Sequence, residues 1–122
     1  MRFFKRGETA DSKFTFLDSE TNEPIDILTP LYKITHFSGA DEIIDVAEIT
    51  MQKVIGDVGV YIVNWLIPND AIENETYFVT AKGVHPTDAT ITVIEDFYRV
   101  LPASFFSGGG GAGGIVAKFT KP

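Results

Sequence analysis

The sequence predicts an all-β fold, an antiparallel β-sandwich of two packed sheets. Apolar and polar side chains alternate with a period of two rather than 3.6, and clusters of turn-forming residues separate the alternating segments at even spacing. The chain has 122 residues and no cysteine, so an apolar core rather than disulfides must stabilise it. Size scaling indicates that folding buries about two-thirds of the unfolded surface, which is enough for such a core.

The first half of the chain is predicted to form three strands. Residues 13–17 and 31–37 alternate large apolar with polar side chains, and the turn formers at 18–24 make them a hairpin followed by a short edge segment. Residues 43–54 follow a second turn and are moderately apolar. We interpret them as a strand, with a helix over 47–53 as the alternative.

The second half contains the clearest strand signals. Residues 60–68 are almost continuously β-branched and aromatic, and this composition predicts a central strand. Its Trp65, the only tryptophan, is expected to anchor the core between the sheets rather than to stack on a sugar. Two further strands are predicted at 76–82 and 89–102, the second with a bulge at 95–96, where the apolar phase shifts.

Charge and composition divide the chain into an N-terminal arm (1–6), a sandwich domain (7–102) and a glycine-rich C-terminal arm (103–122). All 17 acidic residues lie within 7–117 together with five basic ones, so this part carries a net charge of −12. The two ends carry the other five positive charges. An acidic surface of this kind repels phosphate, so we do not expect the body to bind nucleic acid.

The two arms are where we expect partners to bind, because basic and apolar side chains are concentrated at both ends. Residues 107–114 hold six of the eleven glycines and are predicted to be a tether. Residues 115–119 are then expected to pair with another subunit as an added strand. The predicted partner-binding residues are Arg2, Phe3, Phe4, Lys5, Arg6, Phe105, Phe106, Ile115, Val116, Lys118, Phe119 and Lys121.

The sequence predicts no metal or cofactor site. The spacing of Asp18, Glu20 and Asn22 is typical of a calcium loop, but this chain has glutamate where that loop needs glycine and lacks its final glutamate. We therefore interpret the segment as a solvated hairpin turn. The glycine tract has no Lys-Ser/Thr ending and precedes no predicted helix, so it is not a phosphate-binding loop.

Catalytic candidates are few. His36 and His85 are the only histidines, and neither lies in a recognisable motif with a serine or carboxylate. We expect His85 to be exposed in a turn and His36 to be partly buried. A solvated acidic edge, rather than an acid–base pair, is predicted for Asp41, Glu42, Asp45 and Glu48. The sequence thus predicts a protein that is not an enzyme.

Four segments resemble immunoglobulin-like domains of tailed-bacteriophage virions. They are the strand at 7–17, the turn with the sequence NEPID at 22–26, the strand GVYIVNWLIP at 59–68 and the strand ETYFV at 75–79. The resemblance covers residues 7–101. It implies an immunoglobulin-like sandwich in a structural protein of the tail, neck or capsid surface, with no catalytic residues to carry over. The glycine-rich extension lies outside the pattern.

The expected function is that of a structural subunit of a virion, in the neck, tail or baseplate, which docks onto other virion proteins and onto copies of itself through its arms. A capsid-surface decoration or a host-binding adhesion module is the alternative. The N-terminus lacks an apolar signal segment and no stretch has the length of a membrane span. We therefore expect a protein that is not secreted, is located in the virion, and binds neither a membrane nor a small-molecule substrate.

Overall fold

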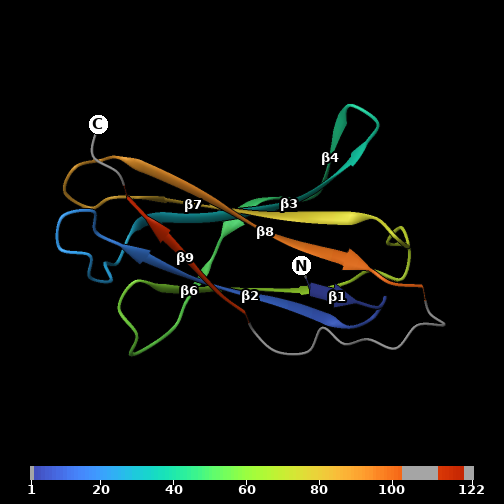
Figure 1. Cartoon of the computed structure of the whole chain (residues 1–122), viewed down its shortest axis with the longest axis horizontal. Coiled ribbons are helices and arrows are strands. Elements are labelled where there is room, and N and C mark those ends of the chain that lie inside the picture. Colours follow the sequence, from blue (N-terminus) through green and yellow to red (C-terminus); the bar gives the residue numbers. More distant parts are fainter. Residues whose placement is uncertain (1, 103–112, 120–122) are drawn as a thin grey trace.

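The computed structural model describes residues 2–102 and 113–119, which form two packed β-sheets (Figure 1). The described residues contain nine strands and no helix. The strands are β1 (Arg2–Phe4), β2 (Thr9–Leu17), β3 (Leu28–Ser38), β4 (Asp41–Thr50), β5 (Gln52–Lys53), β6 (Val60–Leu66), β7 (Thr76–Val84), β8 (Ile91–Val100) and β9 (Gly113–Lys118). The predicted all-β sandwich is confirmed.

Five strands form one sheet and four form the other. The first sheet has the order β1-β8-β7-β3-β4, and the second has the order β5-β6-β2-β9. Neighbouring strands are antiparallel except at two edges, where β1 pairs with β8 and β9 pairs with β2 in parallel. The end of the β3–β4 hairpin extends away from the body at the top of Figure 1.

The core lies between the two sheets and is rich in aromatic side chains. Alternate residues of β2 and β7 are buried, as the period of two predicts. Trp65 on β6 is 7% exposed, and its ring lies 5.2 Å from Tyr77 and 6.5 Å from Tyr98, both of the facing sheet. The prediction that Trp65 anchors the core between the sheets is therefore confirmed.

The predicted hairpin of residues 13–17 with 31–37 is wrong, because β2 and β3 belong to different sheets. The connection stays beside the smaller sheet at Ile25, whose N–H donates to the Phe16 carbonyl at 2.9 Å, and at Asp26, whose carboxylate accepts the Gly59 N–H at 2.7 Å, before it enters β3 of the larger sheet. Gly59 has φ +74°, and a β-carbon there would lie 2.8 Å from the Ile25 nitrogen. Two alternating strands pack in facing sheets as readily as side by side, so alternation does not distinguish these arrangements.

The predicted bulge at 95–96 is also wrong, since β7 and β8 pair in continuous register from Thr76–Arg99 to Val84–Ile91. The apolar phase of the sequence changes because Asp96 occupies an inward position and Phe97 an outward one. The register shifts occur instead where β3 pairs with β4 and with β7. Residues 43–54 are extended throughout β4 and β5, so the strand interpretation holds over the helical alternative.

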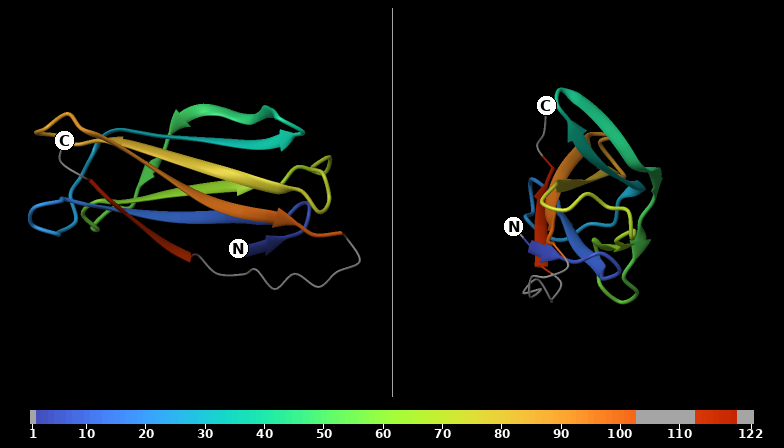
Figure 2. Two further views of the ribbon diagram at one scale, coloured as in Figure 1. Left: turned by 45° about the horizontal axis from the view of Figure 1, so that its top comes forward. Right: turned by 90° about the vertical axis from the view of Figure 1, so that its right-hand side faces the viewer.

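The structure includes parts of both predicted arms in the sandwich. Phe4 of β1 and Phe119, which follows β9, are 3% and 1% exposed and belong to the core. Figure 2 shows β9 (red) along β2 (blue) at the edge of the smaller sheet. An unpaired edge would leave a row of backbone groups without partners, and these terminal strands cover β8 and β2. The sandwich therefore extends beyond the predicted bounds of 7–102.

Candidate functional site

The N-terminal strand is held by a buried polar cluster between the sheets. Arg2 Nη2 lies 2.8 Å from Asp96 Oδ2, and Ser12 Oγ donates to the same oxygen at 2.6 Å. The Ser12 and Tyr98 hydroxyls share a hydrogen bond. Burial, and next the charge of Asp96, raise the pKa of Tyr98 above its usual range, so the phenol stays neutral. The cluster therefore serves as an attachment of β1.

The other basic residues near the N-terminus also contact their own chain. Arg6 Nε donates to the Ala71 carbonyl at 2.6 Å, and Arg6 Nη1 lies 4.0 Å from Glu73. The Lys5 N–H donates to the Glu8 carboxylate at 2.5 Å. The Arg6 contacts fix the segment after β1 against the loop that follows β6, and the Lys5–Glu8 hydrogen bond closes the turn before β2.

The exposed aromatic side chains of the larger sheet form a row on its outer face. Phe37 and Phe78 have ring centroids 5.5 Å apart, and Phe78 and Phe97 are 5.3 Å apart. Phe3 of β1 pairs with Arg99, two residues after Phe97, and is therefore on the same face. Phe3, Phe37 and Phe97 are each 38–44% exposed. Of the predicted partner-binding residues in β1, Phe3 alone thus presents its side chain on an accessible sheet face.

The C-terminal strand divides its side chains between core and solvent. Ala117 and Phe119 are buried, Ile115 is half-buried, and Val116 and Lys118 are exposed. The Phe119 ring lies 5.9 Å from the ring of Phe16. Strand addition, the predicted binding mode, is thus seen on β2 of the same chain, and pairing with another subunit stays a prediction. Phe105, Phe106 and Lys121 lie outside the described residues.

His85 is 6% exposed, so the prediction that it is exposed is wrong. Its Nδ1 accepts the backbone N–H groups of Thr87 and Asp88 at 3.1 Å, which leaves Nε2 to donate to Asp18 Oδ1 at 3.0 Å. The hydrogen bond from His85 is the largest cause that lowers the pKa of Asp18. The imidazole edge also contacts Phe119, at 5.3 Å between ring centroids. His85 therefore joins two turns over the end of β9.

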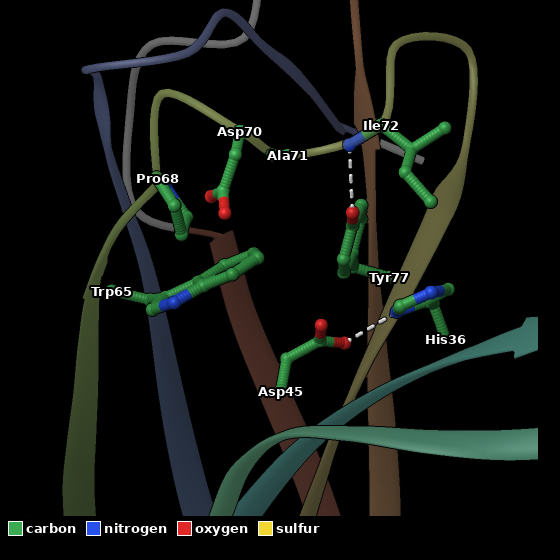
Figure 3. A pocket seen from close by; sticks show the side chains of 8 residues that line it. All are labelled: His36, Asp45, Trp65, Pro68, Asp70, Ala71, Ile72 and Tyr77. Atoms are coloured by element: carbon green, nitrogen blue, oxygen red, sulfur yellow. Dashed lines mark hydrogen bonds and ion pairs between the residues drawn. The ribbon is translucent and has the colours of Figure 1, made fainter.

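A pocket of about 220 Å³ opens between the sheets at the other end of the sandwich (Figure 3). Strands β3, β4, β6 and β7 and the loop that follows β6 each contribute to its lining. The lining residues are His36, Asp45, Trp65, Pro68, Asp70, Ala71, Ile72 and Tyr77.

A bulge in β4 brings Asp45 into this pocket. Ile34 pairs with Val46 and Thr35 pairs with Ile44, so Asp45 is the additional residue of the bulge. Its Oδ2 lies 2.7 Å from Nδ1 of His36, which is 7% exposed. The expected burial of His36 is confirmed. Most of β4 is the exposed acidic edge that was predicted, but sequence alternation gave no signal for the bulge, so the contact between Asp45 and His36 was missed.

Tyr77 forms the wall between His36 and Trp65. Its hydroxyl accepts the Ile72 N–H at 2.9 Å, and its ring centroid lies 5.0 Å from that of His36. Burial raises the pKa of Tyr77, and the negative charges of nearby carboxylates raise it further. The carboxylates that do so are Asp45, Glu75 and Asp70.

The chemistry available in the pocket follows from the side chains that line it. It offers aromatic faces, carboxylates and one imidazole, and its lining includes no serine, lysine or arginine. Across the described ranges, no cluster of three or more His, Cys, Asp or Glu residues is arranged to hold a metal ion.

Comparison of the chain with protein-family models, with curated proteins and with solved structures gave no match. In the part of the chain that the structure describes, no helix is long and apolar enough to cross a membrane.

Proposed function

We propose that the chain is a non-enzymatic structural subunit of a bacteriophage virion, a neck, tail or baseplate component that joins neighbouring subunits through its terminal strands. The observation that carries this proposal is the C-terminal strand. It follows a glycine-rich tract, adds in parallel to the edge of the smaller sheet, and buries Ala117 and Phe119 in the core. The virion setting rests on the sequence resemblance of residues 7–101.

The strand order supports the immunoglobulin-like part of the proposal. In immunoglobulin variable domains the sheets run G-F-C-C′ and D-E-B-A. Here β8-β7-β3-β4 follow the first order, β5-β6-β2 follow D-E-B, and β9 takes the place of strand A. The tryptophan lies on β6 rather than on the strand equivalent to C, and the chain has no cysteine for an inter-sheet disulfide. The likeness is therefore one of topology.

The contacts of β9 are the kind that a neighbouring subunit supplies equally well. The β2 edge accepts a parallel strand from residue 12 to residue 17, and the core accepts one aromatic ring beyond it. A second copy offers the same strand with the same side chains, so exchange conserves these interactions. The entropic cost of closing a loop grows only slowly with its length, so pairing within one chain and pairing between two copies differ little in this cost.

A host-binding or capsid-decorating module is the second candidate. The aromatic row on the outer face of the larger sheet, in which Phe3, Phe37 and Phe97 are exposed around the half-buried Phe78, favours it, because exposed aromatic patches mark interaction surfaces. This face is separate from the β2 edge, so substitutions in the row distinguish the two functions.

Mixing two single-cysteine variants tests directly whether β9 of one chain pairs with β2 of another. The natural chain has no cysteine, so only the introduced cysteines can form a disulfide. Thr15 and Val116 are paired residues of β2 and β9, with Val116 exposed. We expect Thr15→Cys and Val116→Cys chains, unfolded and refolded together and then oxidised, to give disulfide-linked heterodimers on non-reducing gels. Ile91→Cys, exposed on β8, is the matched control and should give none with Thr15→Cys.

Two outcomes contradict the proposal. A Thr15→Cys/Val116→Cys double variant that crosslinks within one chain at every concentration, with no heterodimer in the mixture, would show that β9 stays on its own chain. Absence of the protein from purified particles of a phage that encodes it, measured by mass spectrometry, would exclude the virion role.

A further inference from the structure

We propose that the pocket lined by His36, Asp45, Trp65, Asp70 and Tyr77 is a recognition site for an organic cation, an ammonium or guanidinium head group. The inference stands apart from the virion role, because it depends on the aromatic walls of the pocket, its carboxylates and its size. Each of these features points to the same ligand chemistry.

The aromatic rings that line the pocket are largely packed into the core, and only a small part of each side chain remains accessible beside the cavity. The rings of Trp65 and Tyr77 are inclined at 50° with centroids 5.2 Å apart, and His36 and Tyr77 are inclined at 51°. Trp65, His36 and Tyr77 are each at least 93% buried. Inclined rings form a concave wall, and the faces of tryptophan and tyrosine attract cations most strongly where water is excluded.

Two carboxylates approach the same space from different elements. Figure 3 shows Asp70 reaching toward the Trp65 ring from the loop above, and Asp45 rising from β4 below. One Asp45 oxygen is bonded to His36, and the other faces the space between Trp65 and Tyr77. Arg6, the basic residue that contacts the loop, binds the Ala71 carbonyl and Glu73. Within residues 2–102 and 113–119, no lysine or arginine forms an ion pair with Asp45 or Asp70, so the second Asp45 oxygen and the Asp70 carboxylate are left to face a cationic ligand.

The electrostatic environment of Tyr77 supports this assignment. Burial is the main cause of its raised pKa, and Asp45, Glu75 and Asp70 each raise it further, so their fields meet at this ring. An anionic ligand would meet the same repulsion that disfavours a tyrosinate.

Size and ligand type select a small organic cation over the alternatives. A pocket of about 220 Å³ is below the range of roughly 300–1,000 Å³ that is usual for drug-sized ligands, and it suits a single head group. Calcium and magnesium need about six oxygen ligands, whereas the lining offers two carboxylates beside aromatic carbon. The head group has two sources, a free small amine or a lysine or arginine side chain of a protein partner.

Intrinsic fluorescence reports on this pocket because Trp65 is the only tryptophan. We expect titration with tetramethylammonium chloride to change Trp65 emission saturably, with a dissociation constant on the order of 1 mM. Sodium chloride at equal ionic strength should give no saturable change. N-acetyl-lysinamide represents the side-chain source: tighter binding of this probe assigns the site to a protein partner, and tighter binding of tetramethylammonium assigns it to a free amine.

Matched variants that each remove one negative charge test whether the cation binds in this pocket. Asp70 is exposed on a loop, so Asp70→Asn should fold normally and weaken binding by about tenfold, and Asp45→Asn should do the same. Asp57→Asn removes an equal charge from the exposed turn before β6, at the opposite end of that strand, and should leave binding unchanged. Absence of saturation with both probes, or an equal loss in all three variants, would overturn the proposal.

Discussion

The two terminal strands occupy equivalent positions but are held by different interactions. Both lie parallel to their neighbours, β1 beside β8 and β9 beside β2. β1 contributes a charged residue to the interior, Arg2, whose partners Asp96 and Ser12 come from both sheets. The side chains that β9 and the adjoining Phe119 bury in the interior, Ala117 and Phe119, are both apolar.

The difference indicates which strand is able to leave the sandwich. Removing β1 would leave Asp96, whose side chain is 10% exposed, without its guanidinium partner. Its connection to β2 is also short, and is closed by the Glu8 N–H donating to the Lys5 carbonyl at 3.1 Å. Removing β9 would uncover the apolar core residues that Ala117 and Phe119 contact, and an identical strand from a second copy would cover them again. We infer that β1 is a permanent part of the fold and that β9 is the exchangeable part.

The largest expected effect comes from removing the charge on β1. Arg2→Ala should lower the free energy of unfolding at pH 7 by about 4 kcal/mol, because it leaves a buried carboxylate unpaired. Urea denaturation followed by Trp65 fluorescence measures the loss. Asp96→Asn in the same chain should recover part of it, because the unpaired charge is then gone. A loss below about 1 kcal/mol would show that β1 is held by Phe4 alone.

A somewhat smaller effect is expected from the apolar attachment of β9. Phe119→Ala should cost about 3 kcal/mol, as expected for a buried aromatic ring. The control Val116→Ala, on the exposed face of the same strand, should change stability by less than about 0.5 kcal/mol. Equal effects in the two variants would mean that β9 does not pack as described.

The smallest expected effect is an acid-dependent loosening of β9. The pKa of Asp18 is lowered from 3.8, chiefly by the hydrogen bond from His85, so its contribution to stability is present above about pH 4 and is lost as the pH falls further. His85 contacts Phe119, whose N–H donates to the Leu17 carbonyl at 3.1 Å. Hydrogen–deuterium exchange of the Phe119 amide, corrected for its intrinsic rate, should be faster at pH 3 than at pH 5.

The comparison with β1 is part of the same experiment. The amide of Leu101, which donates to the Phe4 carbonyl at 2.8 Å, should show no matching acceleration. Asp18→Asn should remove most of the difference between the two pH values at Phe119. If both amides accelerate equally, the acid effect is global and not specific to β9.

Local patterns predicted the strands well, since alternation depends only on neighbouring residues. The local composition of residues 60–68 was therefore enough to predict this strand and the burial of Trp65 in the core. The errors arose where distant residues determine the position of a polar group. Asp96 is buried because it bonds to Arg2, and these two residues are 94 positions apart in the sequence. His85 is buried because it bonds to Asp18, 67 positions away. No local rule contains that information.

The candidate pocket was predictable only in its separate parts. The sequence marked Trp65 as a core residue, His36 as partly buried, and Asp45 as one of four clustered acids. Their meeting depends on a bulge in β4 and on the packing of β6 against the facing sheet. A one-residue change of register redirects a side chain to the other face, and the sequence alone does not determine where that occurs.

The parallel pairing of β9 gives any exchanged assembly a direction. Gly113 pairs with Ser12 and Lys118 pairs with Leu17, so a donated strand always enters at one end of β2 and leaves at the other. Where each subunit passes its strand to the next, every link has the same polarity. Such head-to-tail contacts close into a ring if the rotation between subunits divides a full turn evenly, and otherwise continue as an open helical filament.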